Sequence, residues 1–352
     1  MVKETHRTVA PFAAGALLAL CTPAIAMTAE SEAAFETEIS HAKSKMMGHS
    51  ARALEHARRA AKAAAGETAR AKKAKLTARW LEAEALMRLN RAGEASQIID
   101  KAVAETAESF SGSKLHADLL RSQGSLNARR GKFGAALFSF EEAKNAYAAL
   151  GEDRSRAMAL QNIGSVYSAA RDFEQALNFF RQANDIFPSD PALSLAAHNN
   201  MGNALKGLGR YEEAASHFGK ALEAAKARKS PSLEARILTN IASVQALGGS
   251  TTEAEKTAAT AIGLAKEHAP GWARFVEGVF AQIALSRGDL DEAKSHIERA
   301  FTGEDPAKTG AHFREFHEAA VEIFTLSNEP ANADLHRGAL DRLDAQVAKL
   351  GD

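Results

Sequence analysis

The chain has 352 residues, of which 45% are hydrophobic and 25% are charged, so it can bury a sizeable core and is too apolar for general disorder. Forty-four Lys and Arg residues balance forty-four Asp and Glu residues, which gives no bulk attraction to nucleic acid or to an anionic membrane. Aromatic residues make up 6% and prolines number eight. Few segments show the alternation of β-branched residues typical of strands, which favours closely packed helices.

The first residues have the pattern of an export signal. A positive start at Lys3 and Arg7 precedes an apolar run over about residues 9–20, and small side chains lead up to Ala26 in an A-x-A cleavage site. We therefore predict that residues 1–26 are a signal peptide cleaved after Ala26, and that the protein is periplasmic or secreted in a bacterium. An uncleaved membrane anchor is the alternative.

Cleavage at this site would remove Cys21, the single cysteine of the chain. The mature protein would then contain no thiol, no disulfide and no cysteine metal site, which suits an oxidising compartment. A lipoprotein anchor at Cys21 is disfavoured because Leu20 precedes it, where a small residue is wanted. Since no other apolar stretch is long enough to cross a bilayer, we expect no transmembrane span in the mature chain.

A repeating pattern of small and apolar residues runs through most of the chain. A small residue is followed twelve positions later by an alanine, then by an apolar residue after four positions and another alanine after seven. Five successive units carry it: Gly124/Ala136/Phe140/Ala143, Gly164/Ala176/Phe180/Ala183, Gly202/Ala214/Phe218/Ala221, Ala242/Ala254/Ala258/Ala261 and Ala281/Ala293/Ile297/Ala300. Looser units start at His41, Ala83 and Val321, and the starts lie 38 to 42 residues apart.

This pattern describes pairs of packed helices. The small residue allows the first helix to approach the second closely, and the three later residues share one face of the second helix. Glycines mark the turns between the helices: Gly131, Gly209, Gly249 and Gly288. A single pair cannot bury its apolar face alone, so the pairs must stack on one another.

These units resemble the tetratricopeptide-repeat (TPR) family in its long-repeat form. The G, Y, A, F, A and P positions of the family consensus are occupied by Gly164, Tyr167, Ala176, Phe180, Ala183 and Pro188. The resemblance implies an all-α, right-handed α-solenoid of about seven to eight helical hairpins. The expected organisation is a signal peptide (1–26), a linker (27–34) and a TPR solenoid (35–350) with units near 35–68, 76–110, 117–150, 157–190, 195–228, 235–268, 274–303 and 311–350.

In the TPR family the first helix of each pair lines a concave groove, where asparagines hold the partner's main chain. Asn162, Asn200 and Asn240 lie two positions before the small residue in three central units. Asparagine is disfavoured inside helices, and its donors and acceptor suit an extended peptide. The full set of predicted groove residues adds neighbours on the same face and nearby cations: Asn162, Asn200, Asn240, Ser165, Asn203, Ser243, Gln161, Asn199, Lys206, Arg121, Arg129 and Arg236. Alternatively, the asparagines bond to the neighbouring helix.

Charge is unevenly distributed along the chain. Residues 41–91 contain thirteen Lys or Arg against four Asp or Glu, whereas residues 291–352 contain thirteen acidic and seven basic residues. The basic stretch is either a solvated helix face or a patch that contacts an anionic partner. Trp80 stands alone in it without the interleaved aromatics of nucleic-acid binders, so no nucleic-acid partner is expected.

The sequence shows no catalytic constellation. His312 and His317 lie five positions apart and do not share a helix face well, and no H-E-x-x-H, G-x-S-x-G or phosphate-binding glycine motif is present. We therefore expect no catalytic residue, no metal site and no cofactor.

The sequence as a whole predicts a non-catalytic exported TPR scaffold that binds a protein or an extended peptide in its concave groove. The alternative is a ligand- or partner-sensing module of an envelope signalling system that acts with a separate membrane output protein. It rests on the segments at residues 312–317 and 335–344, which loosely resemble the last hairpin of exported TPR sensor regions in bacteria.

Overall fold

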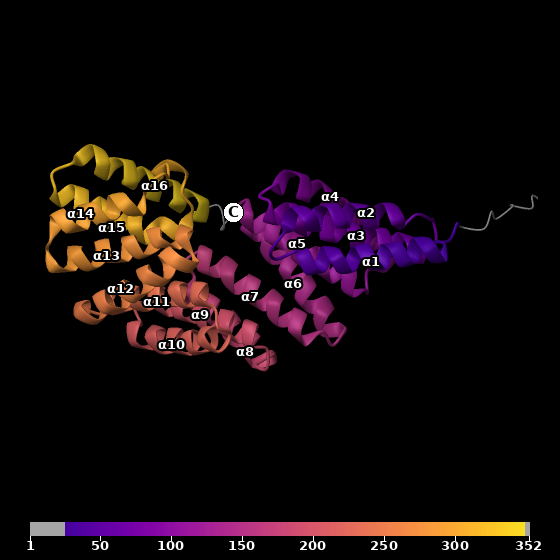
Figure 1. Cartoon of the computed structure of the whole chain (residues 1–352), viewed down its shortest axis with the longest axis horizontal. Helices are drawn as coiled ribbons and strands as arrows, with labels where there is room; N and C mark the ends of the chain where they lie inside the picture. The colour runs from indigo at the N-terminus through magenta and orange to yellow at the C-terminus, as the bar shows by residue number, and fades with distance from the viewer. Residues whose placement is uncertain (1–24, 349–352) are drawn as a thin grey trace, which may run out of the picture. The chain divides into compact units, whose positions relative to one another are not determined.

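The computed structural model describes residues 25–348, which contain sixteen α-helices and no strands. Seven pairs of consecutive helices form hairpins (Figure 1): α1/α2 (Ala29–Lys45, Ser50–Ala63), α5/α6 (Lys114–Arg129, Phe133–Ala149), α7/α8 (Asp153–Ala169, Phe173–Ile186), α9/α10 (Pro191–Gly207, Tyr211–Ala227), α11/α12 (Pro231–Leu247, Thr251–His268), α13/α14 (Ala273–Arg287, Leu290–Ala300) and α15/α16 (Arg314–Leu326, Pro330–Ala348). The remaining helices, α3 (Ala69–Arg88) and α4 (Ala92–Phe110), follow α2 in the chain. Three short 3₁₀ helices lie near the C-terminal end: η1 (Pro270–Trp272), η2 (Pro306–Lys308) and η3 (Ala311–Phe313). The predicted all-α architecture of repeated hairpins is confirmed.

The chain divides into two compact units, and the boundary along the sequence falls inside α3. One unit extends to Ala85 and contains α1, α2 and most of α3, and the other begins at Leu86 and contains α4 to α16. The run of repeats predicted over residues 35–350 is thus divided into two bodies. Residues 1–24 of the predicted signal peptide and residues 349–352 lie outside the described part of the chain.

Acidic side chains fix where several helices of the second unit begin. Asp172, Asp190 and Asp289 each accept a hydrogen bond from a backbone N–H in the first turn of α8, α9 or α14. Pro191 follows Asp190 at the first position of α9. Proline lacks a backbone N–H, but an N–H at this position would have no acceptor within the helix, so no hydrogen bond is lost. These helix starts are therefore encoded locally.

Turns within the hairpins use the left-handed backbone conformation. Gly131, Gly209, Gly249 and Gly288, the predicted turn glycines, have φ angles of +71° to +84°. Glycine has no Cβ to clash in this conformation. The turn of α7/α8 has Arg171 at φ +64° instead, which costs an L-residue about 1 kcal/mol.

The small residue of each regular repeat packs against a partner on the second helix of its own hairpin. A Cβ added to Gly202 would lie 2.6 Å from the ring of Phe218, and Gly124 and Gly164 have the same relation to the phenylalanine sixteen positions later. Where the small residue is alanine, the partner sixteen positions on is a buried side chain smaller than phenylalanine: Ala258 for Ala242 and Ile297 for Ala281. A Cβ on the first helix is thus accompanied by a smaller side chain on the second, as close packing requires.

The first unit shifts this pattern by one residue. Ala42 is fully buried, whereas His41, the predicted small position, is exposed. The small residue of this hairpin is therefore Ala42, and His41 is available for another role.

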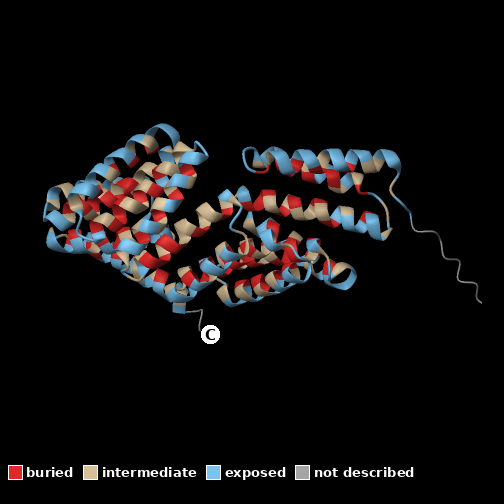
Figure 2. Cartoon of the chain, turned by 90° about the horizontal axis from the view of Figure 1, so that it is seen from below, coloured by how far each residue is buried: buried red, intermediate tan, exposed pale blue. Residues whose placement is uncertain are grey.

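Buried residues line the faces between neighbouring helices, and exposed residues lie on the outer faces (Figure 2). The largest cluster of buried apolar residues spans α11 to α16. In the part of the chain that the structure describes, no helix has the length and apolar character needed to cross a membrane.

Candidate functional site

One cavity of about 730 Å³ in the second unit is lined by the first helices of five successive hairpins, α7, α9, α11, α13 and α15. Its residues follow helical spacing, for example Asn199 with Asn203 on α9 and Asn240 with Ser243 on α11. Each first helix therefore presents one face to a shared space. A cavity of this size can hold a small ligand or a short stretch of peptide.

The wall formed by α7, α9 and α11 carries amides and hydroxyls. Asn240 Nδ2 donates to Asn199 Oδ1 over 3.0 Å and thereby links two adjacent hairpins. The Ser165 hydroxyl donates to the Gln161 carbonyl over 2.9 Å, so its oxygen can still accept a bond. Asn203 completes this wall on the same face of α9. The wall can both donate to and accept from a bound main chain.

A second wall, formed by η1, α13 and α15, is aromatic. The ring centroids of Trp272 on η1 and Phe275 on α13 are 4.3 Å apart, and those of Phe275 and Phe316 on α15 are 6.1 Å apart. Trp272 Nε1 donates to Thr239 Oγ1 over 3.0 Å, which fixes the indole. The Arg236 guanidinium lies 4.6 Å from the centroid of a Trp272 ring, a cation–π contact.

The cavity lining carries an excess of positive charge. Four of its residues are cations, Arg171, Lys206, Arg236 and Arg314, whereas Glu315 supplies its one carboxylate. A cleft lined mostly by one sign of charge concentrates ligands of the opposite sign. Arg314 is paired with Asp344 over 2.7 Å, and Arg171 and Lys206 also have carboxylate partners, so Arg236 is the lining cation for which the described residues show no ion pair. An acidic group of a ligand can pair with Arg236.

Two ion pairs tie the C-terminal hairpin to the middle of the solenoid beside this cavity. Lys206 Nζ lies 2.7 Å from Glu315 Oε2, which joins α9 to α15 across 109 positions of sequence. Arg171 in the α7/α8 turn lies 3.9 Å from a carboxylate oxygen of Glu318, also on α15. Burial raises the pKa of Glu318, and the charge of Arg171 opposes that rise.

Seven of the twelve predicted groove residues line the cavity: Ser165, Asn199, Asn203, Lys206, Arg236, Asn240 and Ser243.

Asn162 and Asn200 are half-buried and lie outside the cavity lining. On α9 the cavity is lined by Asn199 and Asn203, three positions before and one position after the small residue Gly202. Each step along a helix turns the side chain by roughly 100°, so Asn200 lies on another face of α9 than Asn199.

Gln161, Arg121 and Arg129, also predicted for the groove, contact other parts of the second unit. Gln161 is 9% exposed and donates from Nε2 to the Leu193 carbonyl over 3.0 Å, so it packs α7 against α9 instead of facing the groove. Arg129 on α5 donates to the Met87 carbonyl over 3.2 Å. Arg121, also on α5, lies by the buried Tyr147, whose pKa is raised by burial and partly lowered by the charge of Arg121. None of these three lines the cavity.

Sequence reasoning missed the aromatic and C-terminal wall. The missed residues that line it include Trp272, Phe275, His312, Arg314, Glu315 and Phe316, and Phe173 of α8 is a further missed lining residue. The repeat pattern tracks small residues, and the 3₁₀ segments η1 and η3 fall between its units. The concentration of aromatic residues from Trp272 to Phe316 was the available signal.

The basic stretch over residues 41–91 is partly neutralised within the first unit. Arg58 pairs with Glu82, Arg59 with Glu38 and Arg70 with Glu32 in this unit, and Arg91 pairs with Glu94 in the second unit. Pairs of this kind on an exposed surface contribute little to stability.

Two family models match the chain. A tetratricopeptide-repeat model matches residues 193–267, and the CNOT10 tetratricopeptide repeat domain matches residues 46–199. Together they span most of the hairpins, and the chain belongs to the tetratricopeptide-repeat family. No curated protein matches it significantly.

Several solved structures share this fold. The apo form of RapI is 13% identical, with a TM-score of 0.63 over 90% of this chain and 98% of that one. A Rap protein complexed with competence and sporulation factor is 15% identical, with a TM-score of 0.62 over 91% and 99%. A tetratricopeptide repeat protein from Parabacteroides merdae is 18% identical, with a TM-score of 0.53 over 78% and 98%.

Proposed function

We propose that this protein is a non-catalytic scaffold that binds an extended peptide or protein segment in the cavity lined by α7, α9, α11, α13 and α15. The observation that carries this proposal is the pairing of an amide-lined wall with an aromatic wall across one space. Amides such as Asn203 and Asn240 can donate to and accept from a peptide main chain. The rings of Trp272 and Phe275 offer apolar surface to a side chain.

The lining also indicates the chemistry of the bound segment. None of the carboxylates within residues 25–348 forms an ion pair with Arg236, which stacks on Trp272. An acidic group of the ligand can therefore pair with Arg236 while an adjacent apolar side chain contacts the indole. A second acidic group can compete with Glu315 for Lys206. We infer that the ligand is an acidic segment with an apolar or aromatic side chain.

One of the similar structures holds a bound factor. It is the Rap protein complexed with competence and sporulation factor, whose fold covers nearly the whole of this chain. This supports a binding role for the fold, whereas the choice of ligand depends on residues of this chain.

Loss of the aromatic wall tests the proposal. A labelled peptide library is screened on the full-length protein, and the affinity of selected peptides is measured by fluorescence anisotropy. We expect acidic peptides, and we expect Trp272→Ala to weaken their binding by about 2 kcal/mol, roughly thirtyfold, since buried tryptophans dominate binding energy. Phe138→Ala is the matched control, because Phe138 is 69% exposed on α6. Unchanged binding by a folded Trp272→Ala protein would refute this site.

A second comparison tests which asparagines contact the ligand. Asn203 lines the cavity and Asn162 does not. We expect Asn203→Ala to weaken peptide binding by about 1 kcal/mol, the net value of one hydrogen bond, and Asn162→Ala to leave it unchanged. The same anisotropy titration measures both, with circular dichroism as the check of folding. The opposite order of effects would place the ligand on another face of these helices.

We also propose that the protein is exported and processed after Ala26. The support is the N-terminal pattern of a positive start, an apolar run and an A-x-A site. Cell fractionation followed by N-terminal sequencing tests it. Export predicts a periplasmic or secreted protein that begins at Met27, whereas a cytoplasmic protein that retains Met1 would contradict it.

A further inference from the structure

Two hairpins carry the same trio of polar side chains. Glu38, His56 and Arg59 in α1/α2 correspond to Glu277, His296 and Arg299 in α13/α14. In each hairpin the histidine Nδ1 lies 2.6 or 2.7 Å from the glutamate Oε2, and the arginine Nε lies 3.1 or 2.8 Å from the same oxygen. The arginine Nη2 also lies 2.7 or 2.6 Å from the histidine Nδ1. The trio thus joins the two helices of a hairpin in both places.

The two hairpins differ at the ring that stacks on the histidine. His41 lies three positions after Glu38, and its ring centroid is 4.9 Å from that of His56. The corresponding residue of α13/α14 is Phe280, 5.0 Å from His296. A phenyl ring satisfies the packing there, so packing does not require the nitrogens of His41. Among residues 25–348, none forms a hydrogen bond with the His41 ring.

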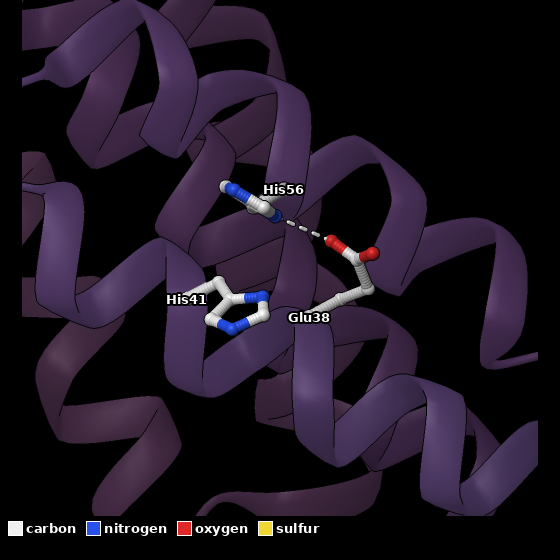
Figure 3. Close-up of side chains that lie close together, drawn as sticks. All are labelled: Glu38, His41 and His56. Carbon is white, nitrogen blue, oxygen red and sulfur yellow. Dashed lines mark hydrogen bonds and ion pairs between the residues drawn. The ribbon is translucent and has the colours of Figure 1, made fainter.

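Glu38, His41 and His56 converge on one point (Figure 3). Each offers one ligand atom, and these three atoms all lie within 4.8 Å of one another. Glu38 and His41 are one turn apart on α1, and His56 faces them from α2. The side chains of Glu38 and His56 are 21% and 19% exposed, so an ion and a water molecule can reach them.

We propose that Glu38, His41 and His56 form a binding site for Zn²⁺. Two imidazole nitrogens and one carboxylate oxygen are donors that zinc prefers, and three protein ligands leave a fourth tetrahedral position for water or for a group of a partner. The hairpin α13/α14 retains the glutamate and the histidine but lacks the third ligand. The molecule therefore contains its own matched control.

The charge state of the site suits a cation. Glu38 Oε2 lies 2.6 Å from His56 Nδ1 and 3.1 Å from Arg59 Nε, so the carboxylate already faces positively polarised groups at the place a cation would occupy. Zn²⁺ would bind His56 Nδ1 only in its deprotonated form, so a ring that donates from Nδ1 to Glu38 would release that proton to solvent on binding. The Arg59 side chain is half exposed and can turn outward as the ion enters.

Zinc titration of the full-length protein by isothermal calorimetry tests the site. We expect wild type to bind one more Zn²⁺ per chain than His41→Phe or His56→Gln, or to bind it more than about tenfold more tightly. His296→Gln, the matched change in α13/α14, should retain the wild-type titration. His41→Phe should fold normally, because Phe280 occupies the same position in α13/α14, and circular dichroism verifies this.

Two further readouts use the same proteins. Zinc should raise the melting temperature of wild type but not of His41→Phe, since a ligand that binds only the folded state stabilises it. Arg59→Gln should tighten zinc binding, because it removes a competing cation. The proposal would be overturned if His41→Phe bound zinc like wild type, or if His296→Gln lost as much zinc binding as His56→Gln. Weaker zinc binding by Arg59→Gln would also overturn it.

Discussion

The hairpins α9/α10 and α15/α16 carry histidines at the same place, one on each helix and nineteen positions apart. In α9/α10 the Nδ1 atoms of His198 and His217 are 3.1 Å apart, and both rings are half-buried. In α15/α16 the Nδ1 atoms of His317 and His336 are 2.8 Å apart, and the residues are 0% and 5% exposed. Burial lowers the pKa of all four rings, and lowers it to about 4 for His317 and His336.

The surroundings explain this difference. Thr309 Oγ1 donates to the Pro306 carbonyl and lies 2.7 Å from His317 Nε2, so it accepts from that nitrogen. His317 Nδ1 is then an acceptor for His336 Nδ1–H, which makes a satisfied neutral pair. Phe301 covers both rings. The repeat thus fixes the geometry of a histidine pair, whereas the neighbouring loops and rings fix its protonation.

The largest expected effect is a loss of stability in acid caused by His317 and His336. In the unfolded chain these rings bind protons near pH 6.5, but in the folded chain only near pH 4. Stability is therefore full above about pH 6.5 and falls as the pH drops toward 4, by about 3 kcal/mol for one ring. Urea unfolding at a series of pH values measures this.

Variants assign the acid effect to one pair. His336→Leu should flatten the fall in unfolding free energy between about pH 6.5 and 4. His198→Leu, in the half-buried pair, should leave most of it. An equal slope in wild type and His336→Leu would show that other groups cause the acid sensitivity.

A smaller effect is expected from the close contact between the small residue of a repeat and the side chain sixteen positions later. Gly202→Ala forces a Cβ to 2.6 Å from the ring of Phe218, which is fully buried. We expect a loss of about 2 kcal/mol in the free energy of unfolding. Gly219→Ala in the same hairpin meets nothing within 4 Å and should stabilise α10 by about 0.5 kcal/mol. Chemical denaturation compares them, and equal effects would refute the close contact as the cause.

The smallest effect concerns the α7/α8 turn, which reaches α15 through Arg171. Arg171→Gly removes a side chain from a left-handed position and loses an exposed ion pair with Glu318. We expect the unfolding free energy to rise by about 0.5 kcal/mol, because relief of backbone strain exceeds both the entropy of glycine and the weak pair. Acidic peptides should bind more weakly to this variant. A destabilised protein with unchanged peptide affinity would make Arg171 a purely structural residue.

The sequence by itself predicted features that depend on residues near one another in the chain. Gly202 and Phe218 lie sixteen positions apart in one hairpin, so helical periodicity was enough to predict that their helices approach closely at the small residue. The turns at Gly209 and Gly249 follow from local backbone chemistry. For the same reason the family resemblance could be recognised from spacing alone.

The sequence predicted only part of the cavity lining, because an error of one residue places a side chain on a different face of the helix. Of the predicted asparagines, Asn199, Asn203 and Asn240 line the cavity, but Asn162 and Asn200 do not. One residue along a helix rotates the side chain by roughly 100°. Which face meets the cavity is set by the angles between hairpins, and no single hairpin encodes those angles.

Only the tertiary structure decided which distant side chains line the cavity together with the asparagines. Glu315 reaches Lys206 from 109 positions away, and Trp272 enters the cavity from a short 3₁₀ helix outside the repeat pattern. The same holds for the neutral pair of His317 and His336, since burial by other segments displaces their pKa. Local periodicity builds each hairpin, but the rotation accumulated over successive hairpins determines which distant side chains meet, and their desolvation then sets their chemistry.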